Sequence, residues 1–225
     1  MIFNPNKWIS AKKTVLGQRK ENLMKLDGQV NQGVMLNNVQ DIQMRQGICY
    51  ALSTEWCLCM QKNKNFDFNS VFYRMVSRQR AYNLTFADKI KNMTQGNKYQ
   101  LFFNTAEPPS FKFMQDQAKH EGVTTVRQLV PPSEIEDKLS KAIKSGESCI
   151  LGFFGVDSNQ NWGHATAVGL RDIAGSKPRF FDPNQGQYSW PKDTNTTKIA
   201  RDIMQNINMF YGLNTIRNFV IYGLS

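Results

Sequence analysis

Three residues of this chain have the side-chain types that a thiol hydrolase requires, namely Cys49, His164 and Asp182. A cysteine thiolate is a strong nucleophile, an imidazole can move a proton near neutral pH, and a carboxylate can hold the imidazole in one tautomer. A nucleophile beside a base that a third group orients performs acyl transfer on several unrelated folds. These side chains can act together only if the local structure brings them into contact.

The sequence around Cys49, QMRQGICYALSTEW, predicts a loop that delivers this cysteine to the first turn of a helix. Gly47 gives the backbone freedom just before the cysteine, and the residues after it have the apolar character of a largely buried helix. Unpaired backbone N–H groups and the helix dipole at such a position favour an anion, which here would be a thiolate. The alternative for any single cysteine is a role as a small buried hydrophobic residue.

His164 and Asp182 are predicted to lie at neighbouring strand ends. His164 opens an alternating strand in NWGHATAVGL, and Asp182 closes an aromatic strand before a Pro-Asn turn in RFFDPNQGQY. Sequential strands joined by a short connection usually pair as antiparallel neighbours, so the start of the first lies beside the end of the second. The pattern therefore predicts contact between the imidazole and the carboxylate. For each residue alone, a hydrogen-bonded strand histidine or a turn-forming aspartate is the ordinary alternative.

An acyl-transfer site also needs hydrogen-bond donors for the oxyanion of the tetrahedral intermediate. We expect the backbone N–H of Cys49 to supply one donor and a side-chain amide to supply another. Gln43, which precedes the cysteine by six residues, is the first candidate for this amide, and Gln46 is the second. Trp162 and Tyr50 lie beside the histidine and the cysteine in sequence and are candidates either for lining a substrate cleft or for packing.

The predicted elements segregate along the chain. The first half is mainly helical, with helices expected after Cys49, at residues 70–83 and from about Ser110. The second half has strand patterns at residues 124–130, 147–155, 163–172, 177–184 and 215–224, and helix patterns at 131–146 and 197–212. Ser133 and Glu136 are predicted to form a capping box at the start of the first of these helices. This order predicts an α+β fold in which an antiparallel sheet packs against helices, without internal repeats.

Length and composition indicate one globular domain. The chain has 225 residues, of which 40% are hydrophobic and 12% aromatic, and no apolar run approaches the roughly 20 residues of a membrane-spanning helix. Residues 1–40 are polar and amide-rich and are predicted to form a flexible or targeting arm, with the catalytic domain at residues 41–225. The first residues lack the basic and then apolar pattern of a cleavable secretory signal, so any export is expected to use another route.

The charged residues and the cysteines narrow the class of partner. Lys and Arg outnumber Asp and Glu by 28 to 18, which gives a formal net charge of +10 and suits anionic partners such as an acidic lipid surface. The basic residues are spread out and no nucleic-acid-binding motif accompanies them, so nucleic acid is not an expected partner. All four cysteines are expected to be reduced, and their spacing matches no zinc site, so neither a metal nor another cofactor is predicted. A monomer is favoured.

The blocks GICYALSTEW, GHATAVGL and FFDPNQGQY, in this order and spacing, resemble the three signature blocks of the YopT-type cysteine peptidases, a papain-like family of bacterial effectors and toxins. The resemblance covers residues 41–225. It implies a papain-like fold and a triad of Cys49, His164 and Asp182. It also implies that the protein is secreted without a signal peptide into a target cell, where it cleaves a specific protein in the host cytoplasm or at a membrane surface.

Three other functions would use the same residues or the same scaffold. A lysine fatty acyltransferase and a peptidoglycan amidase would both employ the Cys-His-Asp triad, and an inactive papain-like scaffold would only bind a partner. Within the resembled family the protein substrates differ. A chain with a net charge of +10 would repel a polybasic target, so cleavage of small GTPases near a basic C-terminus is not the default expectation.

Overall fold

The computed structural model of the chain describes residues 24–37, 48–61, 65–91, 125–145, 148–157, 160–169 and 177–224. The strands in these ranges are β1 (Lys25–Gly28), β2 (Thr125–Val130), β3 (Ser148–Asp157), β4 (Gln160–Gly169), β5 (Arg179–Asp182), β6 (Gly186–Ser189) and β7 (Ile216–Leu224). The helices are α2 (Gln32–Leu36), α3 (Cys49–Gln61), α4 (Phe68–Lys91), α7 (Ile135–Lys144) and α8 (Thr196–Tyr211), with 3-10 turns η2 (Pro132–Glu134) and η3 (Leu213–Thr215).

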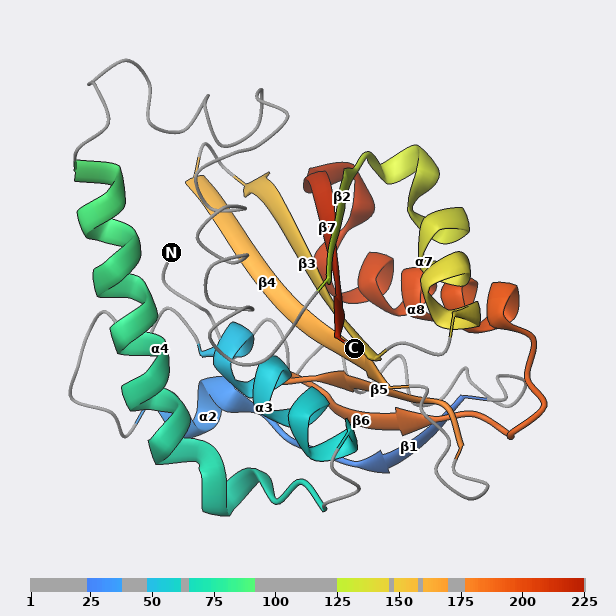
Figure 1. Cartoon of the computed structure of the whole chain (residues 1–225), viewed down its shortest axis with the longest axis horizontal. Coiled ribbons are helices and arrows are strands. Elements are labelled where there is room, and N and C mark those ends of the chain that lie inside the picture. Colours follow the sequence, from blue (N-terminus) through green and yellow to red (C-terminus); the bar gives the residue numbers. More distant parts are fainter. Residues whose placement is uncertain are drawn as a thin grey trace.

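The strands form one antiparallel sheet, with helices on both of its faces (Figure 1). The strand order is β1-β6-β5-β4-β3-β7-β2, and every pairing between neighbours is antiparallel. The nucleophile helix predicted after Cys49 is α3, and it packs on the sheet. The predicted α+β class is therefore confirmed. The helix predicted from about Ser110 lies outside the described residues.

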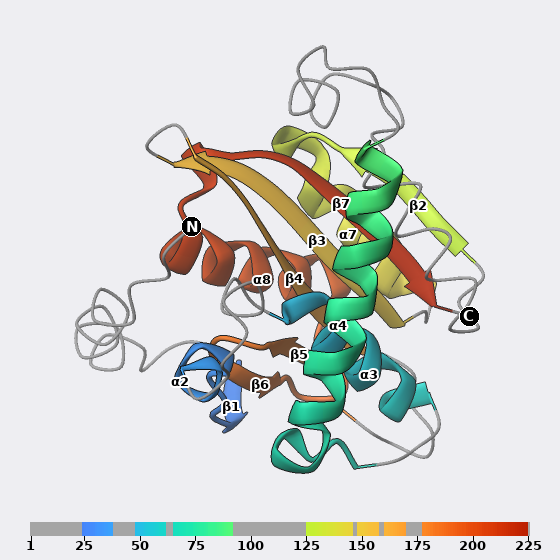
Figure 2. The ribbon, with the colours of Figure 1, turned by 90° about the vertical axis from the view of Figure 1, so that its left-hand side faces the viewer.

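Alternation along β3 sends its side chains into two separate cores, because successive residues of a strand point to opposite faces of the sheet. Ile150 belongs to the core beneath α3 and α4, whereas Cys149 and Leu151 belong to the core beneath α7 and α8. Figure 2 shows α4 in front of the sheet and α7 and α8 behind it. The sheet is thus the middle layer of three, and its long central strands are buried on both faces.

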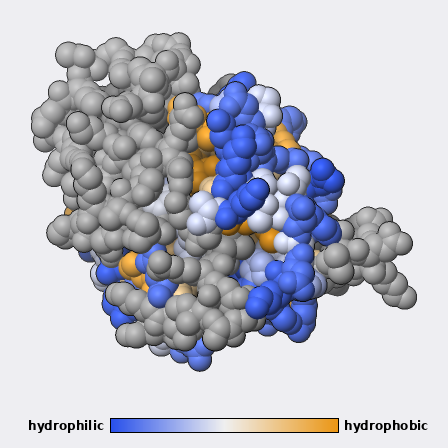
Figure 3. Space-filling view, turned by 45° about the vertical axis from the view of Figure 1, so that its right-hand side comes forward, coloured by the Kyte–Doolittle hydropathy of each residue, from blue (hydrophilic) through white to orange (hydrophobic). Residues whose placement is uncertain are grey.

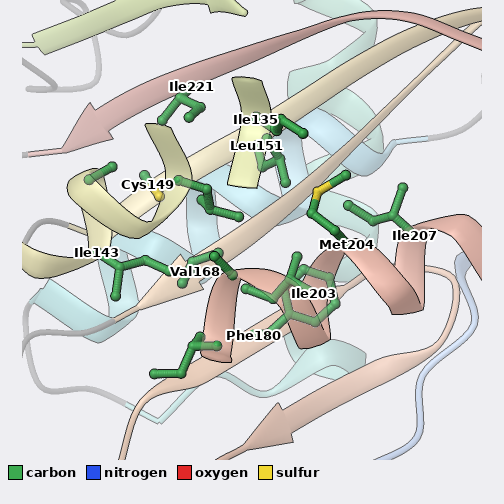
Figure 4. Close-up of a cluster of buried hydrophobic side chains, with 14 of the residues drawn as sticks. Ile135, Ile143, Cys149, Leu151, Val168, Phe180, Ile203, Met204, Ile207 and Ile221 are labelled. Atoms are coloured by element: carbon green, nitrogen blue, oxygen red, sulfur yellow. The ribbon is translucent and has the colours of Figure 1, made fainter. Parts of the chain in front are cut away.

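The core beneath α7 and α8 explains why these two segments are amphipathic. Leu151 and Val168 of the sheet belong to the same buried cluster as Ile203 and Ile207 of α8 (Figure 4). The outer face of α7 is polar, and Figure 3 shows that the described surface on this side of the molecule is mostly hydrophilic. An apolar stripe at helical spacing with a polar opposite face therefore places each helix on the sheet.

The long helix α4 is attached to α3 through one of its faces. Phe72 and Met75 are buried in the shared core, and Arg74 and Arg78 form salt bridges to Glu55 of α3 at 2.6 and 3.2 Å. This position beside the nucleophile helix is the one predicted from the sequence. Among the described helices, none combines the length and the apolar character that crossing a bilayer would require.

The predicted capping box of Ser133 and Glu136 is wrong. Residues 132–134 form the 3-10 turn η2, and α7 begins only at Ile135, with Glu134 as a cap residue that makes no side-chain hydrogen bond. Pro131 and Pro132 have fixed φ angles and no backbone N–H, so they favour a tight turn and the α-helix starts later.

Residues 24–37, which the sequence pattern assigns to a polar arm, contribute β1 and α2 to the folded structure. β1 pairs with β6, and Lys25 lies opposite Ser189. The backbone N–H of Gln32 donates to the carbonyl oxygen of Pro183 at 2.8 Å. Residues 1–23 and 38–40 of the predicted arm lie outside the described ranges. At least the segment from β1 to α2 is therefore bonded to the sheet edge that carries β5 and β6.

The close approach of β1 to β6 depends on Gly186, which has a φ of 140°. A Cβ at this residue would overlap the carbonyl oxygen of Gly28. Gly186→Ala should therefore push β1 away and lower the free energy of unfolding by about 1–3 kcal/mol. Gly28→Ala is the matched control, because a Cβ there meets nothing within 4 Å. Urea denaturation of both variants measures the difference, and equal losses of stability would contradict the close approach.

Candidate active site

His164 and Asp182 lie side by side on neighbouring strands. β4 and β5 pair antiparallel with Ala167 opposite Phe181 and Gly169 opposite Arg179, so the end of β5 comes next to the middle of β4, where His164 lies. Nε2 of His164 is 3.0 Å from Oδ1 of Asp182, and the side chains are only 5% and 0% exposed. The strand pairing and the contact predicted from the sequence are both present. The prediction that His164 opens its strand is wrong, because β4 begins at Gln160 and His164 lies in its middle.

Asp182 is a fully buried carboxylate that is surrounded by hydrogen-bond donors. The backbone N–H of Asn184 donates to it at 2.8 Å and Nε2 of Gln185 at 2.9 Å. The hydroxyl of Tyr211 lies 3.1 and 2.9 Å from its two oxygens. Because an unpaired buried charge is costly, these donors make the burial of the carboxylate possible. Two of them come from the Pro-Asn-Gln turn that follows β5, in which an aspartate side chain ordinarily accepts from the N–H two residues later.

Cys49 occupies the first position of α3, as the sequence predicts, and its thiol is close enough to the His164 ring to help raise the pKa of that imidazole. Because Nε2 of His164 faces Asp182, Nδ1 is the ring nitrogen that faces the sulfur. The imidazole therefore stands between a thiol and a carboxylate. This is the order of partners in a nucleophile, base and orienter arrangement.

The helix that carries Cys49 is fixed to the strands that carry its two partners. Oγ of Ser53 donates to the carbonyl oxygen of Ala165, the residue after the histidine, at 3.0 Å. The Trp56 ring stacks on Phe181 with 5.7 Å between centroids and 8° between planes. Nε1 of Trp56 also donates to Oε1 of Gln187 at 2.8 Å. These contacts join α3 to β4, β5 and β6, so the position of the thiol is tied to the sheet.

The last residue of α8, Tyr211, supports the imidazole from the other layer of the fold. Its ring stacks on His164 with 4.8 Å between centroids and 28° between planes. Burial, followed by the charge of Asp182, raises the pKa of Tyr211 well above its ordinary value, so the hydroxyl remains a donor to the carboxylate. Tyr211 therefore contacts both His164 and Asp182.

The two candidate cleft residues are both engaged in aromatic packing. Trp162 is half-buried and stacks on Tyr211 with 6.2 Å between ring centroids. Tyr50 is buried in the core beneath α3, where its ring meets Tyr222 edge-on at 6.4 Å. Trp162 thus lies next to Tyr211, whose ring stacks on His164, whereas Tyr50 belongs to α3 and is buried in the core between this helix and the sheet.

The charges around His164 favour its protonated form. Burial alone would lower the pKa of this imidazole, but the charges of Asp182 and Cys49 and its hydrogen bonds to both raise the pKa from 6.5 to about 10. At neutral pH the ring is therefore an imidazolium. An imidazolium in contact with a thiol is the setting in which a thiolate is stabilised by a neighbouring positive charge.

The backbone at the start of α3 is held by glutamine side chains. The N–H of Ile48 donates to Oε1 of Gln32 at 2.8 Å, and the N–H of Ala51 donates to Oε1 of Gln79 at 3.1 Å. The N–H of Cys49 has no partner within the helix, as holds for the first residues of any α-helix. Gln43 and Gln46, the two candidates for the oxyanion amide, lie outside the described residues.

Cys49 differs from the other cysteines in its surroundings. None of the four cysteines, all of which lie in the described ranges, forms a disulfide, and Cys57 and Cys149 are buried whereas Cys49 and Cys59 are partly accessible. Burial, and then the nearby Cys149, raise the pKa of Cys57 well above its ordinary value, which keeps that thiol protonated. Within the described ranges, no group of three or more His, Cys, Asp and Glu side chains could hold a metal ion.

Sequence reasoning did not single out Gln32, Asn184 or Tyr211 as site residues. Asn184 lies in the turn of the third signature block, but the sequence pattern predicted no role for its side chain. Tyr211 ends a helix that was predicted, and its aromatic character alone indicates packing. Gln32 lies in a polar, amide-rich segment, where nothing distinguishes it from the other glutamines.

Comparisons with known proteins show the family and the fold of the chain. Residues 20–222 match the profile of a peptidase family described as Yersinia/Haemophilus virulence surface antigen. The fold is similar to that of the Pseudomonas avirulence protein AvrPphB, with a TM-score of 0.54, 20% identity, and coverage of 81% of this chain and 93% of that chain. No curated protein sequence matched the chain. The predicted papain-like fold is confirmed.

A second similar structure is PatoxP, a cysteine protease-like domain of the Photorhabdus asymbiotica toxin PaTox. Its TM-score is 0.48 and its identity is 12%, with coverage of 98% of this chain and 58% of that chain.

The raised pKa of His164 makes folding stability depend on pH. The folded chain binds this proton more tightly than the unfolded chain does, because the pKa is about 10 in place of 6.5. The resulting stabilisation is complete below the unfolded pKa and is lost as the pH rises through the folded pKa. The free energy of unfolding should therefore fall from pH 6.5 to about pH 10. Urea denaturation across this range should show a smaller fall for His164→Gln, and identical pH dependence for both proteins would contradict the assignment.

Proposed function

Because the chain belongs to the peptidase family described as Yersinia/Haemophilus virulence surface antigen, we propose that its cysteine peptidase activity is carried by Cys49, His164 and Asp182. The observation that carries this assignment is the position of the His164 ring, which hydrogen-bonds to Asp182 and lies close enough to Cys49 for the thiol to help raise the pKa of the imidazole. Asp182 holds the imidazole in one orientation, and the imidazolium stabilises the thiolate.

In the first half-reaction, the thiolate of Cys49 attacks the carbonyl carbon of the scissile peptide bond. A C–S bond forms and the carbonyl electrons move to the oxygen. The resulting oxyanion accepts a hydrogen bond from the backbone N–H of Cys49, which has no intrahelical acceptor. Gln43 is our first candidate for the second donor, and Gln46 is the alternative. The C–N bond then breaks, and Nδ1 of His164 gives its proton to the leaving amine.

In the second half-reaction, the neutral imidazole of His164 takes a proton from a water molecule. The resulting hydroxide attacks the thioester carbonyl, and the same N–H groups stabilise the second oxyanion. The C–S bond breaks, the new carboxyl group leaves, and the pair of thiolate and imidazolium is restored. Asp182 remains ionised throughout and stabilises the imidazolium by charge and by hydrogen bonding.

The substrate in this proposal is a specific protein of a target or host cell. The family consists of virulence proteins, and the similar AvrPphB is an avirulence protein. The net charge of +10 suits a substrate that is acidic or that is held at an anionic membrane surface. Trp162 is positioned beside the Tyr211 and His164 rings and is the aromatic residue that we place nearest to the bound substrate.

Changing Cys49 to Ala should abolish cleavage while leaving the fold intact, because Ala retains helix propensity and removes only the sulfur. Purified protein would be added to lysates of candidate target cells, and new protein N-termini would be identified by mass spectrometry. Cys59→Ala is the matched control, since Cys59 is also partly accessible and lies on the same helix. New N-termini are expected with the unmodified chain and with Cys59→Ala, but not with Cys49→Ala.

The same experiment separates the peptidase from other uses of the triad. If acyl-CoA is added and acyl mass appears on lysines without new N-termini, the protein is an acyltransferase. If purified peptidoglycan is released as soluble fragments while proteins remain intact, it is an amidase. Undiminished cleavage by Cys49→Ala would contradict the nucleophile assignment.

A further inference from the structure

We propose that Gln32 is a positioning residue that links Ile48, at the start of the helix that carries Cys49, to Asp182, the residue that orients the base. This inference rests on the proposed triad and extends it to a segment that the sequence pattern assigns to a polar arm. Gln32 lies on α2, outside the three signature blocks. Its side chain begins a chain of hydrogen bonds that runs through Asn184 and Tyr211 to the carboxylate of Asp182.

Each link of this chain has the length of a good hydrogen bond. Oε1 of Gln32 accepts from the backbone N–H of Ile48 at 2.8 Å, and its Nε2 donates to Oδ1 of Asn184 at 2.8 Å. Nδ2 of Asn184 donates to the hydroxyl oxygen of Tyr211 at 3.0 Å. That hydroxyl donates to Asp182, whose carboxylate is hydrogen-bonded to the base.

The two ends of the chain are the two parts of the site whose relative position matters most. Ile48 directly precedes the nucleophile Cys49, and Asp182 sets the orientation of His164. A displacement of about 1 Å between nucleophile and base can cost on the order of 100-fold in rate, because the reacting atoms leave the productive geometry. The chain of hydrogen bonds from Gln32 to Tyr211 is therefore in a position to fix the distance between Cys49 and His164.

Burial of its members makes this chain of hydrogen bonds stiff. Gln32 is 4% exposed and Asn184 is 6% exposed, so water cannot readily replace a lost partner. The backbone holds the same geometry, because the N–H of Gln32 donates to the carbonyl oxygen of Pro183 in the turn after β5. Asn31 caps α2 by accepting from the N–H of Val34 at 3.2 Å. Gln32 is thus held in place by its own helix cap, by the turn and by both of its side-chain partners.

The test uses Gln32→Met, which keeps the length of the side chain but cannot make either hydrogen bond. The first measurement is the rate at which iodoacetamide alkylates Cys49, determined residue by residue with mass spectrometry. The second is the ultraviolet absorbance of the Cys49 thiolate, taken as the difference from Cys49→Ala. Neither needs a known substrate. We expect Gln32→Met to lower the alkylation rate by about tenfold and to reduce the thiolate absorbance at neutral pH.

The control is Leu36→Ala, which removes a buried apolar contact from the same helix without touching the hydrogen-bonded chain. This variant should lose stability but keep the wild-type alkylation rate and thiolate absorbance at temperatures well below its melting point. Loss of both signals in Leu36→Ala would show that any damage to α2 has the same effect, and would overturn a specific positioning role for Gln32.

Tyr211→Phe interrupts the chain at its other end and keeps the ring that stacks on His164. If Gln32→Met fails to fold, Gln32→Glu takes its place, because it keeps the acceptor for the N–H of Ile48 and loses the donor to Asn184. Tyr211 donates directly to Asp182, so Tyr211→Phe tests the far end of the hydrogen-bonded chain and not Gln32 itself. The alkylation rate of Tyr211→Phe should fall, and the double variant should react no more slowly than the slower single variant, because both changes break one chain. A wild-type rate in Gln32→Met or in Tyr211→Phe, or effects that multiply in the double variant, would overturn the inference.

The proposed triad can fail separately in this experiment. If Cys49 of the unmodified chain reacts no faster than Cys59, the thiol is not activated, and the proposed function and the positioning role fail together. If Cys49 is activated and Gln32→Met reacts like the unmodified chain, only the positioning role is wrong.

Discussion

The burial of the Asp182 carboxylate is the constraint on which the site depends. A charge at 0% exposure must be surrounded by donors, and here these come from β4, from the turn after β5 and from the end of α8. Satisfying the carboxylate therefore brings together segments that are far apart in sequence. The same bonds set the direction of His164 and leave its second ring nitrogen to face Cys49. Structural and chemical requirements coincide in this one side chain.

The three-layer architecture provides the other half of the arrangement. The core beneath α3 fixes the helix that carries Cys49, and the core beneath α8 fixes the helix that carries Tyr211. β4 lies between the two layers and carries His164 in its middle. The site forms around the middle of this strand, where His164 contacts Asp182 at the end of β5 and Tyr211 at the end of α8. Because side chains alternate along the central strands, one sheet packs against both the helix that carries Cys49 and the helix that carries Tyr211.

The parts of this structure that could be predicted from sequence are those with a strong local pattern. The apolar stretch after Cys49, the alternation that follows His164 and the Asp-Pro-Asn turn each have one favourable local conformation, and strand adjacency then gave the contact between His164 and Asp182. The strands β1 and β6 were not predicted, because each has only four residues and its pairing depends on the close approach at Gly186.

The missing site residues could not be found by the same reasoning. Gln32 acquires its role only through tertiary contacts with Ile48 and Asn184, and a glutamine in a polar segment looks the same whether or not such contacts exist. The capping box at Ser133 failed because two prolines changed the local backbone. Local propensity therefore located Cys49, His164 and Asp182, whereas the residues that hold them in place are defined by the folded chain.

The rate of alkylation of Cys49 in Asp182→Asn tests the central claim most directly. Asparagine keeps the shape of the side chain but removes the charge that stabilises the imidazolium. Because the protonated form of His164 is then less stable, Cys49 should react with iodoacetamide at neutral pH about tenfold more slowly than in the unmodified chain. Cys59 should keep its wild-type rate. If Cys49 of a folded Asp182→Asn variant reacted as fast as in the unmodified chain, the buried carboxylate would not organise the site.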